Sequence, residues 1–307
     1  MLKVSQSMLH VTKRLLVLLL LSLLLCACSS DVPQPTVNDD VDGTRIIALA
    51  PHLTEIMFAA GAGKSLVGAV RYSDYPPAAN QIPLIGDAFR VDYEQIVKLS
   101  PDIVLSWAGG TPNEITQYLS GLGFRIVEFE SQRLLDIPRH VEELGKLADT
   151  SLVAGKIANQ MQQQIISLQK KFADRPKVSV FLQISADPWF TVTRQHILND
   201  AIETCGGENV FSHLAGVAPV VSFESIVKAD PDAIIVVTVS ADGDWQEEWR
   251  PWEKMAAVRH QRIYPVNTDL LSRAGPRMIM GAVQICAALE SARAGLAVRT
   301  IPVTAVP

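Results

Sequence analysis

Short, largely apolar runs alternate along most of the chain with longer stretches in which apolar residues recur at helical spacing. Runs of the first kind are typical of strands in a sheet that is covered on both faces, and they occur at 45–50, 66–70, 103–106, 125–129, 177–184, 233–239 and 262–266. Stretches such as 54–60 and 113–121 are typical of helices. The alternation predicts an α/β fold with a central parallel-type sheet.

A twelve-residue segment occurs twice, 130 residues apart. Residues 93–104, YEQIVKLSPDIV, and residues 223–234, FESIVKADPDAI, are identical at six of twelve positions. Each copy predicts a short helix, a Pro-Asp turn and a buried strand. A duplication at this spacing indicates two similar α/β lobes.

The segment between the two halves has the composition of a helix. Residues 151–172 contain no proline and one glycine, and they predict one long helix that joins the lobes. Such a connector allows less movement of the lobes than flexible strands would. We therefore expect an N-terminal lobe at 44–148, an interlobe helix at 149–174, a C-terminal lobe at 175–295 and a tail at 296–307.

The first residues predict an export signal. Residues 15–25, LLVLLLLSLLL, follow Lys3, Lys13 and Arg14. The run is shorter than the roughly 20 residues that a membrane span needs, and a basic segment followed by a short apolar run is typical of a secretory signal, here 1–27. Residues 25–28, LCAC, resemble the lipobox of bacterial lipoproteins, which implies cleavage before Cys28 and lipidation of that cysteine. The alternative is ordinary cleavage, which would release a soluble secreted protein.

Composition after cleavage indicates an acidic exported domain on a tether. Residues 29–43 are small, polar and acidic, so we expect 28–43 to be a lipidated N-terminus with a flexible tether. Removing the signal deletes three of the 27 basic residues and none of the 32 acidic ones, which leaves 24 − 32 = −8. That balance argues against a nucleic-acid partner.

Two cysteines, Cys205 and Cys286, remain for the folded part. In an oxidising compartment such a pair predicts one disulfide, and two separate buried thiols are the alternative.

Motifs of common catalytic centres are missing from the mature sequence. It contains no Gly-x-Ser-x-Gly, His-Glu-x-x-His or Cys-x-x-Cys, and its five histidines have no metal-ligand spacing. Residues 61–65, GAGKS, lack the glycine that a phosphate loop needs at Phe58, and they follow a predicted helix. We interpret them as a helix C-terminus followed by a turn.

Three groups of residues are candidates for binding because of their position. Pro51 and His52 follow the first predicted strand, where ligands of α/β sheets gather; the alternative is a helix start on the surface. Trp107 ends a predicted strand before two glycines, which suits stacking on a flat ligand, although a core tryptophan would occupy the same position. The acidic tryptophan cluster around 245–252 predicts either a mobile lid or a surface helix.

Glu94 and Glu224 occupy the same position in the two copies of the repeat. Each is explained as an acid in the first turn of a helix, where it is stabilised by the helix dipole. The matched placement permits a second interpretation, in which the pair anchors a two-fold symmetric partner.

Several segments together resemble the cobalamin-binding proteins of bacterial ABC importers, in the periplasmic family of siderophore, haem and cobalamin receptors. The resemblance extends from about residue 45 to 291 and is carried by residues 72–77, 94–102, 107–110, 180–183, 205–211 and 269–277. It implies two lobes joined by a rigid helix, with a corrinoid bound in the cleft as transported cargo. It implies neither a catalytic activity nor a cofactor.

The resemblance also implies roles for individual residues. Tyr72 and Trp107 should flank the corrin ring, and Phe190, Asp269 and Arg273 should face it from the second lobe. To these we add Pro51, His52 and Phe89 as candidate ligand-binding residues. Cys205 and Cys286 match the family's disulfide. Glu94 and Glu224 match two glutamates that dock onto arginines of a dimeric permease, which works with ATPase subunits. We expect a monomeric, periplasmic, membrane-anchored lipoprotein.

This sequence departs from the family pattern at aromatic positions. Residues 217–220, VAPV, stand where the family has a tryptophan, Leu270 and Leu271 stand where it has aromatics, and Ala88 followed by Phe89 stands at another aromatic wall. The loss of aromatic surface leaves haem, a siderophore or a different corrinoid as alternative ligands. A chelatase-like enzyme on the same scaffold is a more distant alternative.

Overall fold

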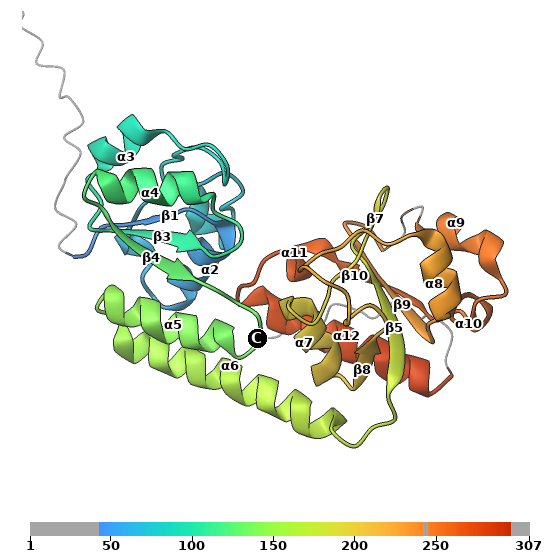
Figure 1. Cartoon of the computed structure of the whole chain (residues 1–307). Coiled ribbons are helices and arrows are strands. Elements are labelled where there is room, and N and C mark those ends of the chain that lie inside the picture. Colours follow the sequence, from blue (N-terminus) through green and yellow to red (C-terminus); the bar gives the residue numbers. More distant parts are fainter. Residues whose placement is uncertain (1–42, 242, 244, 296–307) are drawn as a thin grey trace, which may run out of the picture. The chain divides into compact units, whose positions relative to one another are not determined.

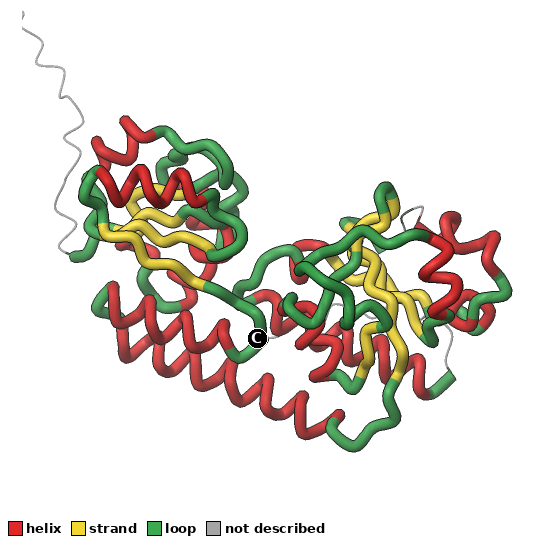
Figure 2. The backbone as a smooth tube through the Cα atoms, viewed as in Figure 1, coloured by secondary structure: helices red, strands yellow, loops and turns green. Residues whose placement is uncertain are grey.

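The computed structural model describes residues 43–295 except 242 and 244. The predicted signal, Cys28, the tether and the tail lie outside the described residues. Two separate four-stranded parallel sheets dominate the described part (Figures 1 and 2).

The first sheet has the order β2-β1-β3-β4. Its strands are β1 (Ile46–Ala48), β2 (Leu66–Ala69), β3 (Ile103–Trp107) and β4 (Arg125–Phe129), and every pairing is parallel. All four coincide with predicted strands. The inner strand β3 is buried over Ile103–Ser106, as expected for a sheet covered on both faces.

Helices cover both faces of this sheet. Because successive side chains of a strand point to opposite faces, neighbouring residues pack against different helices. On one face Ile46, Ala48 and Leu105 pack against α2 (Pro51–Ala59) and α5 (Asp136–Leu147). On the other face Ile47 and Val104 pack against α3 (Tyr93–Leu99) and α4 (Asn113–Gly121).

The second sheet repeats the first. Its order is β8-β5-β9-β10, formed by β8 (Gly207–Asn209), β5 (Val178–Gln183), β9 (Ala233–Thr238) and β10 (Ile263–Asn267). In both sheets the first strand along the chain lies between the second and the third, and the fourth follows the third. The predicted duplication into two similar lobes is therefore confirmed.

The second sheet is also covered on both faces. One face packs against α7 (Ile197–Thr204) and α12 (Arg277–Arg293). The other packs against α8 (Phe223–Ala229), α9 (Trp245–Trp249), α10 (Ala256–Arg259) and the residues around them. The 3₁₀ turn η3 (Arg250–Trp252) joins α9 to α10, and α11 (Thr268–Leu271) precedes α12.

Two of the three tryptophans of the cluster, Trp245 and Trp249, belong to the core of the second lobe, and Trp252 is 40% exposed. Trp249 is fully buried and donates its Nε1–H to Oε1 of Gln183 at 2.9 Å, while Trp245 is 8% exposed. The mobile-lid interpretation is wrong, because these rings fill the space between β9 and the helices on its outer face. The surface-helix alternative is correct for the backbone of α9 alone.

One long helix connects the lobes. Helix α6 (Ser151–Phe172) has the bounds that the sequence predicts and packs against α5 in the first lobe and against α7 and α12 in the second. The side chain of Met161 contacts the apolar cores of both lobes. Figure 1 shows α6 running below the first sheet, beside α5, and ending before the loop that leads to β5.

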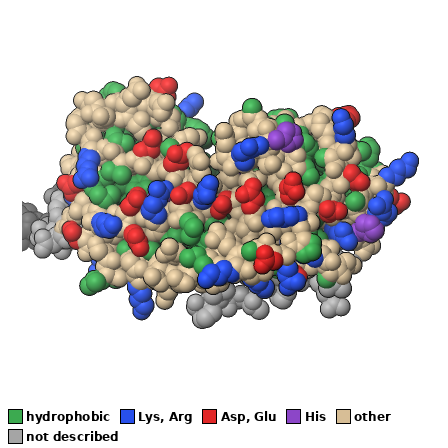
Figure 3. Space-filling model, turned by 60° about the horizontal axis from the view of Figure 1, so that its bottom comes forward, with side chains coloured by type: hydrophobic (Ala, Val, Ile, Leu, Met, Phe, Trp, Pro, Cys, Tyr) green, Lys and Arg blue, Asp and Glu red, His purple; other side chains and the backbone are tan. Residues whose placement is uncertain are grey.

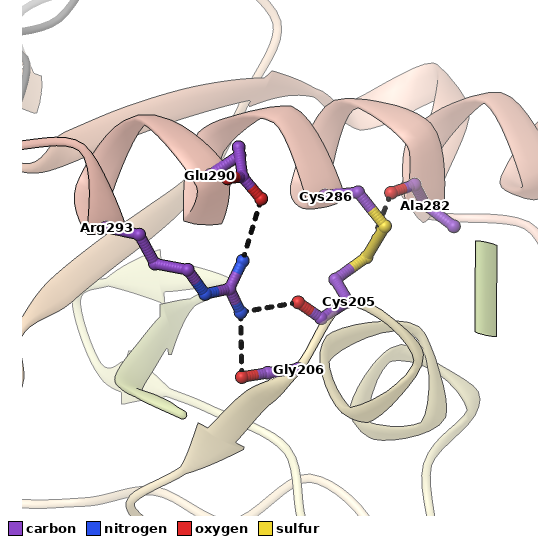
Figure 4. The surroundings of a disulfide bond; sticks show 6 residues. All are labelled: Cys205, Gly206, Ala282, Cys286, Glu290 and Arg293. Atoms are coloured by element: carbon purple, nitrogen blue, oxygen red, sulfur yellow. Dashed lines mark hydrogen bonds and ion pairs between the residues drawn. A yellow bond between two sulfur atoms is a disulfide. The ribbon is translucent and has the colours of Figure 1, made fainter. Parts of the chain in front are cut away.

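The predicted disulfide is present between Cys205, at the end of α7, and Cys286 in α12 (Figure 4). Arg293 strengthens the same junction by donating to the carbonyl oxygens of Cys205 at 2.8 Å and Gly206 at 3.0 Å. The disulfide therefore connects α12, the last helix of the lobe, to α7, the helix that precedes the edge strand β8.

Two small features escaped the sequence pattern. Strand β8 consists of three residues, Gly-Glu-Asn, with no apolar signal, and the hairpin β6 (Ser185–Ala186) and β7 (Trp189–Phe190) has strands of two residues. Within the described residues no helix is both long and apolar enough to cross a membrane. On the face drawn in Figure 3, basic and acidic side chains are interspersed.

Candidate functional site

Trp107 ends β3 with its side chain 37% exposed. Its backbone N–H donates to Oγ1 of Thr111 at 3.0 Å, and its carbonyl accepts from the N–H of Thr111 at 2.9 Å. A Cβ on Gly110 would lie 1.8 Å from the indole ring, so the glycine lets the chain fold back along the ring. The interpretation of Trp107 as a core tryptophan is wrong, because more than a third of the side chain meets solvent.

Tyr72 follows β2 and is 69% exposed. Its φ is +68°, which is uncommon for a residue with a Cβ and is maintained only where the surroundings fix it. The flanking residues supply that constraint: the N–H of Arg71 donates to Gly86 at 2.8 Å, and the hydroxyl of Ser73 bonds that of Thr54 at 3.2 Å. The tyrosine ring is therefore presented to solvent from a rigid loop.

His52 lies behind Trp107 in the first turn of α2. The imidazole is 4% exposed and meets the indole edge-on, with 5.2 Å between ring centroids. Burial, followed by the nearby charges of His140 and Arg273, lowers the pKa of His52 to about 3. The interpretation of His52 as a surface residue is wrong. Pro51 is the first residue of the helix and is half-buried, as suits a residue without an N–H.

Phe89 lies at the tip of the loop between β2 and α3 and is 73% exposed. The loop is shaped by Asp87, whose Oδ1 accepts from the N–H groups of Phe89 at 2.9 Å and Arg90 at 2.8 Å. These two hydrogen bonds also lower the pKa of the Asp87 carboxyl. The phenyl ring has no role in the core.

The second lobe contributes residues of a different character. Phe190 is half-buried on β7, beside Val220. Asp269 is exposed in the first turn of α11, and its N–H donates to Oδ1 of Asn267 at 2.7 Å.

Arg273 is engaged by the first lobe. Its Nη1 lies 3.0 Å from Oε1 of Glu55 and 2.8 Å from Oδ1 of Asp74. Arg277 approaches the same Glu55 carboxylate from Nη2 at 2.7 Å and from Nε at 3.1 Å. The guanidinium of Arg277 also stacks over the ring of Tyr75, 4.2 Å from its centroid. We call Glu55, Asp74, Arg273 and Arg277 the interlobe clamp.

The interlobe clamp is buried at one end and exposed at the other. The side chain of Glu55 is 1% exposed, both arginines are 15% exposed, and that of Asp74 is 55% exposed. The hydrogen bond from Arg273 lowers the pKa of Asp74, and the hydrogen bonds to Glu55 raise the pKa of Arg277. A ligand that binds the guanidinium of Arg273 therefore has to approach from the solvent side, where Asp74 already accepts a hydrogen bond from it.

A polar hollow of about 450 Å³ lies at the carboxyl end of β4. Residues of both signs line it together with the buried ring of His140, and the lining includes Glu128, Glu130, Arg133, Asp136, Arg139 and Glu143. None of the eight predicted ligand-binding residues is among those lining it. Over the residues that the model describes, no group of three or more His, Cys, Asp or Glu side chains has the arrangement of a metal site.

The two copies of the repeat adopt the same local structure. Asp92 and Ser222 cap helices of seven residues, accepting from the N–H groups of Gln95 and Ser225, and both helices end in a left-handed residue. The two helices share Ile-Val-Lys, and Glu94 and Glu224 are both exposed in the first turn. Hydrogen bonds from the backbone and from Ser222 lower the pKa of Glu224.

Comparison with known proteins decides the family. A family model described as periplasmic binding protein matches residues 46–270, from β1 into α11. The chain belongs to the periplasmic binding protein family. The vitamin B12-binding protein of Pectobacterium atrosepticum is 33% identical to this periplasmic binding protein over 276 residues, which is 88% of this chain and 93% of that one.

Solved structures agree with this assignment. The periplasmic vitamin B12 binding protein of Vibrio cholerae is 31% identical and superposes with a TM-score of 0.76, covering 82% of this chain and 98% of its own. A periplasmic heme binding protein from Pseudomonas aeruginosa is 22% identical with a TM-score of 0.69, covering 80% and 92%, and this likeness shows the fold alone.

Sequence reasoning missed part of this binding protein's interlobe surface. Glu55 and Arg277 were not predicted to meet, because they are 222 residues apart and each is unremarkable in its own segment. Asp74, Arg273 and Arg277 lie in segments that carried the family resemblance, which gave a signal for these residues but none for their contact with Glu55. A buried acid that pairs with arginines of the other lobe cannot be recognised from its neighbours in the sequence, because its partners lie far away along the chain.

Proposed function

We propose that this periplasmic binding protein is the substrate-binding component of an ABC importer, and that it captures a corrinoid and delivers it to the membrane permease. The observation that carries the proposal is the pair of exposed rings, Trp107 at the end of β3 and Tyr72 after β2, two strands that flank β1 in the first lobe. The names of relatives matched over most of the chain support the same ligand class.

Exposed aromatic faces suit a corrinoid, because its macrocycle is large and offers a broad face for apolar contact. In the proposed complex Tyr72, Phe89 and Trp107 contact the ring from the first lobe. Pro51 borders the same surface. His52 does not reach the cobalt, because it is 4% exposed behind Trp107; it holds the indole in position.

The second lobe would bind the polar side chains of the ligand. Asp269 is exposed and free to accept hydrogen bonds from amide groups, and Phe190 adds apolar contact. Arg273 contributes through the guanidinium edge that it now shares with the half-exposed Asp74.

Export and anchoring belong to the same proposal. A signal over 1–27 and a lipidated Cys28 would hold a monomeric domain at a membrane in the periplasm. The periplasmic family supports the compartment.

We also propose that Glu94 and Glu224 dock the protein onto the permease. Their support is the matched geometry of α3 and α8, with one exposed carboxylate in each lobe. A permease made of two identical subunits offers the same basic loop twice, and a molecule with two similar lobes can meet both. ATPase subunits would complete the importer.

Calorimetric titration of the mature protein with cyanocobalamin, haemin and a ferric siderophore tests the ligand. We expect tight binding of one cyanocobalamin per chain. Trp107→Ala should weaken that binding about 5- to 30-fold, the scale of one aromatic contact in a desolvated site. Tyr118→Ala is the matched control, since Tyr118 is an exposed aromatic on α4, away from the strand ends, and it should leave the affinity unchanged.

Two results would contradict the proposal in different ways. Tight binding of haemin without binding of cyanocobalamin would transfer the assignment to haem. An unchanged affinity in Trp107→Ala, with cyanocobalamin still bound tightly, would move the ligand away from the end of β3.

A further inference from the structure

Each proposed docking glutamate has an exposed apolar neighbour on its own helix. Val97 is 49% exposed on α3 and Val227 is 36% exposed on α8. Each valine follows its glutamate by three residues, so the two side chains lie on the same side of the helix.

The repeat shows that these valines need an explanation. Of the identical positions, Ile96 and Ile226 are fully buried in the two cores. Asp102 and Asp232 hold the starts of β1 and β5, because their carboxylates accept from the N–H of Arg45 at 2.8 Å and from the hydroxyl of Ser179 at 2.6 Å.

The charged identical positions have a local role as well. The glutamates lie in the first turn and Lys98 and Lys228 in the last turn, where each charge is favourable to the helix dipole. An exposed valine gains nothing from the dipole and lowers helix propensity. Its retention in both copies is therefore not explained by the fold.

An aromatic ring completes each surface. Tyr118 is 52% exposed and packs on Tyr93, the residue before Glu94, with 4.4 Å between ring centroids. Trp252 is 40% exposed and packs on Phe223, the residue before Glu224, at 4.3 Å.

The two rings come from topologically equivalent segments that differ in local structure. Tyr118 lies in α4, between β3 and β4, and Trp252 lies in η3, between the equivalent strands β9 and β10. Different elements thus deliver an exposed aromatic onto the ring that precedes each glutamate. We call Val97 with Tyr118 the first apolar patch and Val227 with Trp252 the second apolar patch.

We propose that the two apolar patches are contact surfaces for a two-fold symmetric membrane partner. In the complex, each patch would lie next to a basic group of the partner, and that basic group would pair with the glutamate on the same helix as the patch. The inference rests on the docking role proposed above and extends it to four residues. Apolar contacts around a charge pair exclude water, which strengthens the pair and concentrates binding energy at the centre of an interface. Two equivalent patches fit a partner that presents the same surface twice.

Binding of the full mature protein to its permease with ATPase subunits, reconstituted in lipid nanodiscs, tests the inference. Val97→Ser with Val227→Ser should weaken complex formation by about tenfold or more, and Tyr118→Ala with Trp252→Ala should do the same. Cyanocobalamin affinity should remain unchanged in both. Leu152→Ser is the control, because Leu152 is 93% exposed on α6 and belongs to neither patch.

Glu94→Ala with Glu224→Ala separates the inference from the docking role on which it rests. If this variant no longer binds the permease while the valine and aromatic variants bind it as tightly as the parent does, the docking role of the glutamates stands. The two apolar patches are then not part of the interface. If neither set of variants loses affinity, both are wrong.

Two further measurements keep the result decisive. Trp252→Ala removes a ring that packs on Phe223, so melting temperatures of all variants are compared, and the valine pair, which is exposed, carries the test if the tryptophan variant unfolds. Light scattering of the parent protein checks for self-association. A dimer that the valine changes dissociate would assign the patches to a second copy of this chain and overturn the inference.

Discussion

His52 shows how burial changes what a residue can do. By position alone it is a candidate contact for a ligand at the end of a strand, yet its ring lies beneath the indole of Trp107 with 4% exposure. A neutral imidazole there is a packing element, and its protonation would place a charge where water does not reach.

This burial predicts an acid sensitivity of the fold. The pKa of His52 falls from 6.5 to about 3 in the folded protein, so between these values the unfolded chain binds a proton that the folded protein does not. The free energy of unfolding should therefore decrease as the pH falls from about 6.5 towards 3, by up to about 1.4 kcal/mol per pH unit from this group. Urea denaturation across that range measures the slope.

His52→Phe isolates the contribution, because phenylalanine keeps a ring against Trp107 and does not titrate. The variant should show a shallower pH dependence than the parent, whatever its absolute stability. His196, whose pKa burial lowers to about 4, remains in both proteins and cancels in the difference, whereas the difference includes the coupling of His52 to His140. Equal slopes would mean that His52 is accessible to protons in the folded state.

Which residues the sequence could place depends on how local their environment is. Trp107 ends a strand, and a strand's end can be located from an apolar run, but the run left its exposure open; Tyr72 was named by the family resemblance alone. The burial of His52 was not predictable, because it depends on Trp107 and on the segment around Gly275, which packs against the His52 side chain from the other lobe.

Among the elements, α2 and the start of α12 meet through a buried cluster of charges. The carboxylate of Glu55 accepts from both Arg273 and Arg277, and all three side chains are at most 15% exposed. Removing one partner from such a cluster leaves charges unpaired away from water.

Glu55→Ala should therefore destabilise the protein by about 3–5 kcal/mol, measured by urea denaturation at neutral pH. Asp74→Ala removes a half-exposed partner of the same arginine and should cost about 0–1 kcal/mol, so it serves as the control. A small, equal loss in both variants would indicate that the interlobe clamp is solvated and contributes little.

Elements with a strong period were predictable from the sequence and short ones were not. The bounds of α4 and α6 agree with the predicted ranges 113–121 and 151–172, because each helix alternates an apolar face with a polar one over two turns or more. Strand β8 has three residues and no apolar pattern; it is a strand because β5 offers it an edge to pair with.

At the scale of the whole molecule, twelve repeated residues sufficed to predict two lobes of one design. The repeat contains a complete unit of helix, turn and central strand, which fixes where the next strands must lie in a parallel sheet. The contacts between the lobes could not be predicted in this way, since Arg273 and Glu55 are 218 residues apart and interact only after both lobes have formed.

The position of Met161 on α6 has a consequence for the kinetics of binding. Its side chain is shared by both apolar cores, so a large rotation of one lobe would have to withdraw it from one of them. A ligand that enters a molecule held in this way meets a site that is already assembled, and no slow rearrangement precedes or follows the encounter.

Stopped-flow fluorescence should therefore give an observed rate constant for cyanocobalamin that rises linearly with ligand concentration, without a plateau. A plateau would reveal a unimolecular closing step and would contradict a stiff connection at Met161. With linear kinetics, the residence time of the cargo is set by the contacts in the site alone. Under the proposed function, release of the cargo then requires a partner that forces the lobes apart at the expense of the packing around Met161.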